Sequence, residues 1–227
     1  MREETASNGL TLRGRPVPTY IAVEGPIGVG KTTLARRIAE TFAHELLLEE
    51  AELNPFLERF YQNRKQTALA TQLFFLFQRV QKITELKQRD MFDQNRVADF
   101  VLEKDPLFAR VNLDADEYAL YQKVFEKMRV DAPVPDLVIY LQANPDRLLE
   151  RIEKRGIDAE RLIERTYLEQ LNEVYSEFFL YYDDAPLLIV NANDIDLTRG
   201  DRDYEQLINY MLDIKKGRHY FNPTFFS

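Results

Sequence analysis

The chain has 227 residues, of which 45% are hydrophobic and 30% charged, a balance typical of one globular α/β domain with a full core and perhaps a lid. The net charge of -8 disfavours a general nucleic-acid surface, because a phosphate backbone would be repelled. The absence of cysteine excludes disulfides and thiol chemistry, and no apolar run reaches the 18 residues of a membrane span.

The first segment of the chain is the polar leader MREETASNGLTLRGRPVPT, which lacks the apolar core of a signal peptide. We expect a flexible N-terminal tail over residues 1–18 and a cytoplasmic location. We expect no nucleic-acid or membrane partner.

The next segment is predicted to hold a phosphate. Residues 19–24 (TYIAVE) have the β-rich apolar character of a buried strand, and residues 32–46 show the apolar spacing of a helix. Between them, residues 25–32 (GPIGVGKT) fit G-x-x-x-x-G-K-[ST] at every fixed position. Strand, glycine loop and helix form the context that this motif requires, whereas the alternative is a glycine-rich turn that matches by chance.

The chemistry of the loop follows from its residue types. Glycines allow backbone N–H groups to surround phosphates, and the N-terminus of the helix adds positive charge. Lys31 would reach the β- and γ-phosphates, and the Thr32 hydroxyl would help to hold Mg²⁺. The predicted ATP-binding residues of this loop are Gly25, Gly28, Gly30, Lys31, Thr32 and Thr33.

Strand and helix signals alternate along the rest of the chain. Further strands are predicted over 45–52, 96–103, 135–143 and 186–194. Helices are predicted over 55–63, 67–90, 114–130, 145–156, 164–182 and 203–216. The alternation indicates an α/β fold with a parallel sheet of about five strands and helices on both faces. One domain would span residues 19–216, followed by a C-terminal tail over 217–227.

The ordered motifs resemble the deoxynucleoside kinase family, most closely the bacterial deoxyadenosine/deoxyguanosine kinases. The resemblance covers nearly everything from residue 20 to 216, and it rests on the phosphate loop, EEAELNPFLERFY, TQLFFLFQR, VADFVLEKDPLF, and RLLERIEKRG followed by YLEQLNEVY. It implies a P-loop fold with an arginine-rich lid, ATP with Mg²⁺, and a homodimer with the long helices as its interface. The implied reaction transfers the γ-phosphate of ATP to the 5′-hydroxyl of a deoxynucleoside, a purine, for nucleotide salvage.

Glu49 is the candidate general base. It lies where the second predicted strand ends, and that end faces the ligand crevice of an open α/β sheet. The resemblance implies that this carboxylate orients the 5′-hydroxyl and accepts its proton. The alternative is a solvated acidic loop formed by Glu49, Glu50 and Glu52.

The long helix predicted over 67–90 carries candidate substrate residues. Gln72 and Arg79 are seven residues apart and so share a face. The resemblance implies that the Gln72 amide pairs with the base, which suits the edge of adenine, and that Arg79 acts nearby. It also implies that Tyr61 contacts the 3′-hydroxyl. The alternative for Gln72 is a surface position.

A basic stripe follows the fourth predicted strand. Arg147, Arg151 and Arg155 repeat every four residues and so align on one helix face, which could close over a triphosphate or form a solvated, salt-bridged face. The resemblance favours Arg151 and Arg155 as phosphate ligands and Glu160 as a ligand of the 3′-hydroxyl. A further lid arginine is replaced by Ile157, for which Arg161 is a candidate substitute.

The plainest departure from the family lies in VADFVLEKDP. The resemblance implies that Asp99 assists Mg²⁺, with Thr32, and that Asp105 helps to read the base. It also implies an arginine after the first acid, where this chain has Phe100. If the enzyme is active, another cation must supply the positive charge of the missing arginine. Arg79 is the favoured candidate, ahead of Arg96, Arg151 and Arg155.

Two other functions remain open at this point. A nucleoside monophosphate kinase, similar to thymidylate kinase, would need a cation for its acceptor phosphate where EEAELNPF offers acid. A catalytically inactive nucleotide-binding module is suggested by Phe100.

Overall fold

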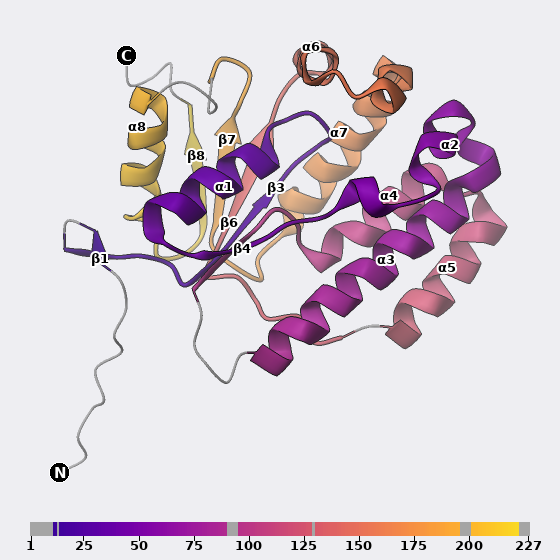
Figure 1. Cartoon of the computed structure of the whole chain (residues 1–227). Helices are drawn as coiled ribbons and strands as arrows, with labels where there is room; N and C mark the ends of the chain where they lie inside the picture. Colours follow the sequence, from indigo (N-terminus) through magenta and orange to yellow (C-terminus); the bar gives the residue numbers. More distant parts are fainter. Residues whose placement is uncertain (1–10, 13, 90–94, 129, 196–200, 223–227) are drawn as a thin grey trace.

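The computed structural model describes residues 11–12, 14–89, 95–128, 130–195 and 201–222. Its core is a parallel sheet of six strands in the order β4-β5-β3-β6-β7-β8 (Figure 1). The strands are β3 (Tyr20–Glu24), β4 (Glu45–Leu47), β5 (Arg96–Ala98), β6 (Leu137–Gln142), β7 (Leu187–Asn191) and β8 (Arg218–Phe221). The predicted parallel α/β sheet is confirmed, with one strand more than the five expected.

The central strand β3 is buried on both faces, as parallel sheets require. Ile21 pairs in register with Val97 on one side and with Leu137 on the other. Ile21 and Val23 pack with the core under α1 (Lys31–Phe42) and α8 (Asp201–Met211), whereas Ala22 faces the cluster that contains Tyr175. The alternation along β3 therefore places helices on both faces of the sheet.

The remaining helices surround this sheet. Figure 1 shows α8 beside β8 at one end, with α2, α3, α4 and α5 gathered toward the other. These and the other described elements are η1 (Ala51–Leu53), α2 (Leu57–Gln62), α3 (Arg64–Arg89), η3 (Leu102–Lys104), α4 (Asp105–Asn112), α5 (Ala115–Met128), α6 (Pro145–Arg155), η4 (Asp158–Leu162) and α7 (Arg165–Tyr181). None of these described helices combines the length and the apolar character needed to cross a membrane.

The two predicted tails differ from the structure where it describes them. The predicted leader contains a small antiparallel pair, β1 (Thr11–Leu12) with β2 (Arg15–Pro16), and Val17 is buried. The predicted C-terminal tail contains β8, which pairs with β7 and buries Phe221 in the core. β8 is short and mostly exposed, so its sequence lacks the continuous apolar run of a central strand. Residues 1–10, 90 and 223–227 of the predictions lie outside the described residues.

The third predicted strand ends earlier than expected. β5 stops at Ala98, and the chain then turns through η3 into α4, which the sequence analysis did not predict. The strand ends here because Asp99 is polar: its side chain accepts hydrogen bonds from the Thr32 hydroxyl and from the Glu49 backbone N–H. This early turn brings three functional segments together at the carboxyl edge of the sheet.

Candidate active site

The phosphate loop leaves β3 at Glu24 and enters α1 at Lys31. All three of its glycines, Gly25, Gly28 and Gly30, have positive φ, and neighbouring elements approach Gly25 and Gly28 closely. A Cβ on Gly25 would lie 2.5 Å from the Leu141 carbonyl oxygen, and one on Gly28 would lie 2.8 Å from a side-chain carbon of Ile152. The missing side chains therefore let the loop fit beneath α6 and keep its backbone open to a phosphate.

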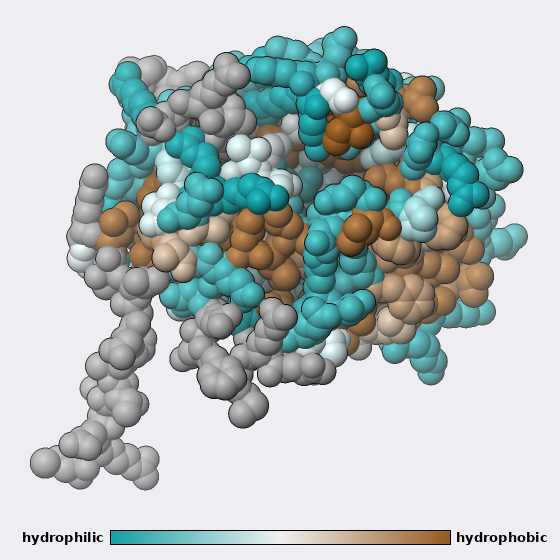
Figure 2. Space-filling view, in the orientation of Figure 1, coloured by the Kyte–Doolittle hydropathy of each residue, from teal (hydrophilic) through white to brown (hydrophobic). Residues whose placement is uncertain are grey.

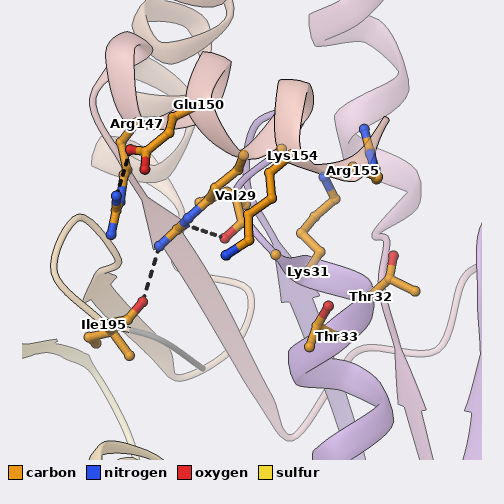
Figure 3. A pocket seen from close by; sticks show the side chains of 12 residues that line it. Val29, Lys31, Thr32, Thr33, Arg147, Glu150, Lys154, Arg155 and Ile195 are labelled. Carbon is orange, nitrogen blue, oxygen red and sulfur yellow. Dashed lines mark hydrogen bonds and ion pairs between the residues drawn. The ribbon is translucent and has the colours of Figure 1, made fainter. Parts of the chain in front are cut away.

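A cavity of about 410 Å³ lies between this loop and α6 (Figure 3). Figure 3 shows Lys31, Thr32 and Thr33 on the α1 side of the cavity and the long side chains of α6 above the loop. The lining residues are Gly28, Val29, Gly30, Lys31, Thr32, Thr33, Arg147, Glu150, Arg151, Lys154, Arg155 and Ile195. The structure thus brings most of the predicted ATP-binding residues to one cavity, with Gly25 at the base of the loop.

Lys31 folds back onto its own loop. Its ammonium donates to the carbonyl oxygens of Gly25, at 2.8 Å, and Pro26, at 3.2 Å. Burial and the positive charge of Lys104 lower the pKa of Lys31 to about 8. A triphosphate would offer this ammonium stronger acceptors than the two carbonyls.

Thr32 and Asp99 form the candidate magnesium position. The Thr32 hydroxyl donates to one Asp99 carboxylate oxygen at 2.6 Å, and the other oxygen accepts the Glu49 N–H at 2.7 Å. Mg²⁺ prefers hard oxygen donors and usually takes only one or two from protein, with water and substrate phosphates completing its shell. The two side chains beside the phosphate loop fit that requirement.

Glu49 lies beyond Asp99 in a buried group of charges. The Arg79 guanidinium donates to one Glu49 oxygen, at 2.7 Å from Nε, and also forms an ion pair with buried Asp105. The Lys104 ammonium donates to the other Glu49 oxygen at 3.1 Å. Burial raises the pKa of Glu49, but Arg79, Lys104 and Lys31 together outweigh it and lower the pKa to about 2. The carboxylate is therefore ionised at neutral pH.

The predicted substrate residues lie on both sides of this group. Gln72 of α3 is only 2% exposed, and its side-chain oxygen has no hydrogen-bond partner among the described residues. Asp105 accepts from Arg79 and from the Tyr121 hydroxyl. An unpaired buried amide oxygen is costly, so a ligand that donates to it would be favoured. This observation opposes a surface position for Gln72.

Tyr61 and Glu160 approach from α2 and η4. Burial raises the pKa of Tyr61, and the neighbouring Tyr167 and Glu160 raise it further. Glu160 forms an ion pair with Arg155, which links η4 to the end of α6. The structure therefore brings Tyr61, Glu160 and Arg155 together, as the predicted roles require.

The arginines of α6 differ from one another. Arg151 donates to the carbonyl oxygens of Val29, at 2.9 Å, Ala192, at 2.6 Å, and Ile195, at 3.1 Å. Arg147 donates to a carbonyl and to Glu150 on its own helix. Arg161, the predicted substitute in the lid, pairs with Asp158 and lies outside the residues that line the cavity. Arg151 thus connects α6 to the loop in this structure.

Lys104 is the functional candidate that sequence reasoning missed. It is 2% exposed, and its ammonium lies 3.1 Å from Glu49 and 3.2 Å from Glu24. Arg96, one of the cations considered instead, lies at the opposite end of β5 from Asp99 and over the Tyr20 ring. The available signal was a lysine among the apolar residues of VLEKDPLF, immediately before Asp105.

Comparison with known proteins places this geometry in context. A sequence model described as deoxynucleoside kinase matches residues 21–214. A deoxyguanosine kinase of Bacillus subtilis is 32% identical over 86% of this chain and 97% of its own length. A deoxyadenosine/deoxycytidine kinase of the same organism is 29% identical over 88% of this chain and 94% of its own.

Solved structures are similar over the same range. A deoxyadenosine kinase from M. mycoides with bound dATP superposes with a TM-score of 0.72 at 31% identity, covering 85% of this chain and 98% of that one. The same enzyme with bound dCTP gives a TM-score of 0.71 at 29% identity, over 86% and 98%. The likeness therefore extends through the sheet and the helices around the site.

Proposed function

This chain belongs to the deoxynucleoside kinase family, and from that membership and its site we propose how it works. It is an ATP-dependent phosphotransferase that moves the γ-phosphate to the 5′-hydroxyl of a purine deoxynucleoside, deoxyadenosine or deoxyguanosine. Its role is nucleotide salvage, and we place it in the cytoplasm. The relatives named for deoxyguanosine and deoxyadenosine support the purine acceptor.

One observation carries the proposal. Two hydrogen bonds connect the phosphate loop with the candidate base: the Thr32 hydroxyl donates to Asp99, and Asp99 also accepts the backbone N–H of Glu49. Phosphoryl transfer needs a held phosphate, a metal position and an oriented acceptor hydroxyl, all within one short span. These hydrogen bonds connect the phosphate loop, the candidate magnesium position and the segment that carries the candidate base.

Each residue then has a chemical task. The loop and Lys31 hold the phosphates, and Thr32 and Asp99 would hold Mg²⁺, which neutralises developing charge when bound. Glu49 orients the 5′-hydroxyl and accepts its proton, while Arg79 fixes Glu49 beside Asp105. Gln72 and Asp105 read the base, Tyr61 and Glu160 hold the sugar, and Arg155 and Arg151 neutralise the transferring group.

The buried amide of Gln72 favours a nucleoside whose base carries a hydrogen-bond donor and a hydrogen-bond acceptor next to each other on one edge. A primary amide offers both groups side by side, which suits adenine. The acidic loop after β4, with Glu50 and Glu52, opposes the second candidate, a kinase that accepts a monophosphate. A negatively charged acceptor would be repelled there.

A homodimer is also part of the proposal. Figure 2 shows apolar side chains gathered over the side of the molecule formed by α3 and α5. Phe77 of α3 and Leu120 of α5 are each 50% exposed, although both are large and apolar. Exposed apolar surface of this kind is typical of a protein interface.

A panel of acceptors tests the proposal. The purified protein with ATP and Mg²⁺ is offered the four deoxynucleosides, their ribose forms and the matching monophosphates, and ADP release is measured. We expect ADP release with deoxyadenosine or deoxyguanosine above all others. Turnover with monophosphates alone would favour the second candidate and contradict the proposal.

A further inference from the structure

The buried ammonium of Lys104 has no role in the function described so far. Lys104 ends η3, immediately before α4, and it is almost completely enclosed. A buried ammonium is costly unless opposite charges and hydrogen bonds compensate it. Here the compensation comes from two carboxylates, those of Glu24 and Glu49.

Glu24 does not depend on Lys104 for its hydrogen bonds. One of its oxygens accepts the Gly25 N–H and the Tyr175 hydroxyl, each at 2.9 Å, and the other accepts the Val101 N–H at 3.1 Å. Two of these three donors are backbone groups on the segments that flank the site. Lys104 is therefore an additional partner for a carboxylate that is already satisfied.

Glu49 is in a different position. Among the described residues, Arg79 donates to one of its oxygens and Lys104 to the other. Arg79 also forms an ion pair with Asp105, and this second contact restrains the guanidinium independently of Glu49. The two cations lie on different elements, α3 and η3, and together they fix both the position and the rotation of the carboxylate.

Phe100 fits the same arrangement. Its ring is buried with Leu76, Val80 and Tyr121, and the Lys104 ammonium lies 6.0 Å from the ring centre. Phe100 therefore supplies packing and an aromatic face, and the charge comes from the residue four positions later. Lys104 thus places a positive charge close to the uncharged Phe100 side chain.

We propose that Lys104 is a positioning residue for phosphoryl transfer: its ammonium fixes the second oxygen of Glu49 and supplies the positive charge that Phe100 lacks. This inference rests on the proposed kinase function. Lys104 acts through Glu49 and does not itself touch the reacting atoms.

The test compares Lys104→Met with the wild type and with Lys82→Met, a matched control. Lys82 binds Glu50 and the Leu48 carbonyl outside the site. We expect Lys104→Met to lower kcat by roughly a hundredfold, as for a misplaced catalytic group, with little change in KM for either substrate. Lys104→Arg should restore part of the rate, and Lys82→Met should match the wild type.

A second readout is independent of turnover. The Glu49 carboxyl is followed by ¹³C NMR at one fixed pH in the nucleotide-free protein, with Glu49→Gln used to assign its signal. We expect the signal to shift in Lys104→Met, where the second carboxylate oxygen loses its donor, and to stay unchanged in Lys82→Met. If Lys104→Met does not fold, Lys104→Gln, which keeps a donor but no charge, provides both measurements.

The outcomes separate the two claims. A wild type that makes no product contradicts the proposed function, whereas the NMR signal of the Glu49 carboxyl still tests the contact with Lys104. An active wild type with a Lys104→Met variant of equal kcat and an unshifted Glu49 carboxyl signal overturns the inference.

Discussion

At the residue scale, the site is governed by how buried charges are paired. Glu49 must remain ionised in a poorly solvated position and must also accept a proton during transfer. Arg79 and Lys104 satisfy the first demand, because each binds one carboxylate oxygen. Glu49 accepts the proton late in the reaction, after the bond between the γ-phosphate and ADP has largely broken, because the attacking hydroxyl becomes acidic only then. This order is expected for a loose transition state.

Glu49→Gln isolates the proton acceptor. The amide keeps the shape of the side chain but cannot take up a proton, so we expect turnover to fall by about 10²–10⁴-fold. Nucleoside affinity, measured by calorimetry, should change little. If Glu50→Gln produced this loss instead, the base would be the neighbouring carboxylate.

Lys31 illustrates a conflict between stability and function. Its pKa is lowered to about 8 from 10.5, so between these values the unfolded chain binds a proton that the folded chain lacks. Stability therefore rises with pH in that window, and below pH 8 the full cost of burying the charge is present. We expect Lys31→Met without nucleotide to have a higher Tm than the wild type at pH 7, with the difference shrinking between pH 8 and 10.

The same Lys31→Met variant should lose the rise in Tm that ATP gives the wild type, because its phosphate ligand is gone. Thermal denaturation with and without ATP measures both effects. A lower Tm for the variant at pH 7 would show that the loop carbonyls compensate the ammonium fully.

Gln72→Ala tests base recognition. Its amide oxygen is buried without a partner among the described residues, so the base should supply the donor. We expect the loss to weaken nucleoside binding by about 1–3 kcal/mol, with ATP affinity almost unchanged. Equal losses for both ligands, measured by calorimetry, would indicate a structural role.

Many of these residues could be predicted from the sequence, because motifs fix their positions in the chain. Which side chains form hydrogen bonds and ion pairs with one another could not be predicted. The P-loop residues follow from their motif, Glu49 follows from the end of a strand together with the family resemblance, and Asp99 follows from the resemblance; the structure places them close together. The lysine in the apolar segment VLEKDPLF was a signal, but the contact of Lys104 with Glu49 could not be predicted, because it depends on β5 ending at Ala98 and on the turn through η3. Arg79, the favoured candidate for the compensating cation, binds Glu49, and Lys104 binds the other carboxylate oxygen.

At the element scale, α6 determines how the phosphate loop is covered. The i, i+4 spacing correctly predicts one stripe of arginines that lines the cavity. It cannot predict that Arg151 binds carbonyls of the loop and of the segment after β7, because those acceptors are distant in sequence. β8 was missed for a related reason: its pairing with β7 is a tertiary interaction of a mostly polar segment.

Arg151→Ala and Arg155→Ala should therefore differ. Arg151→Ala removes three hydrogen bonds between α6 and its neighbours, so we expect Tm to fall by several degrees and ATP affinity to weaken. Arg155→Ala removes a partly exposed ion pair with Glu160, which contributes little to stability, so only turnover should fall. Similar Tm losses in both variants would contradict this division of roles.

At the scale of the whole molecule, large apolar side chains of α3 and α5, among them Phe77 and Leu120, are exposed. Leu120→Asp together with Phe77→Asp would place two charges on the proposed interface. We expect these substitutions to convert a dimer to a monomer in analytical ultracentrifugation. A wild type that is monomeric at micromolar concentration would contradict the proposed dimer.

The central claim is that the charges assembled at the carboxyl edge of the sheet perform ATP-dependent transfer to a deoxynucleoside 5′-hydroxyl. The most direct measurement is ³¹P NMR of the product formed from ATP, Mg²⁺ and deoxyadenosine or deoxyguanosine, with Glu49→Gln run in parallel. We predict a deoxynucleoside 5′-monophosphate and equimolar ADP with the wild type, and almost none with the variant. Tight ATP binding without any monophosphate product would contradict the account and identify an inactive nucleotide-binding module.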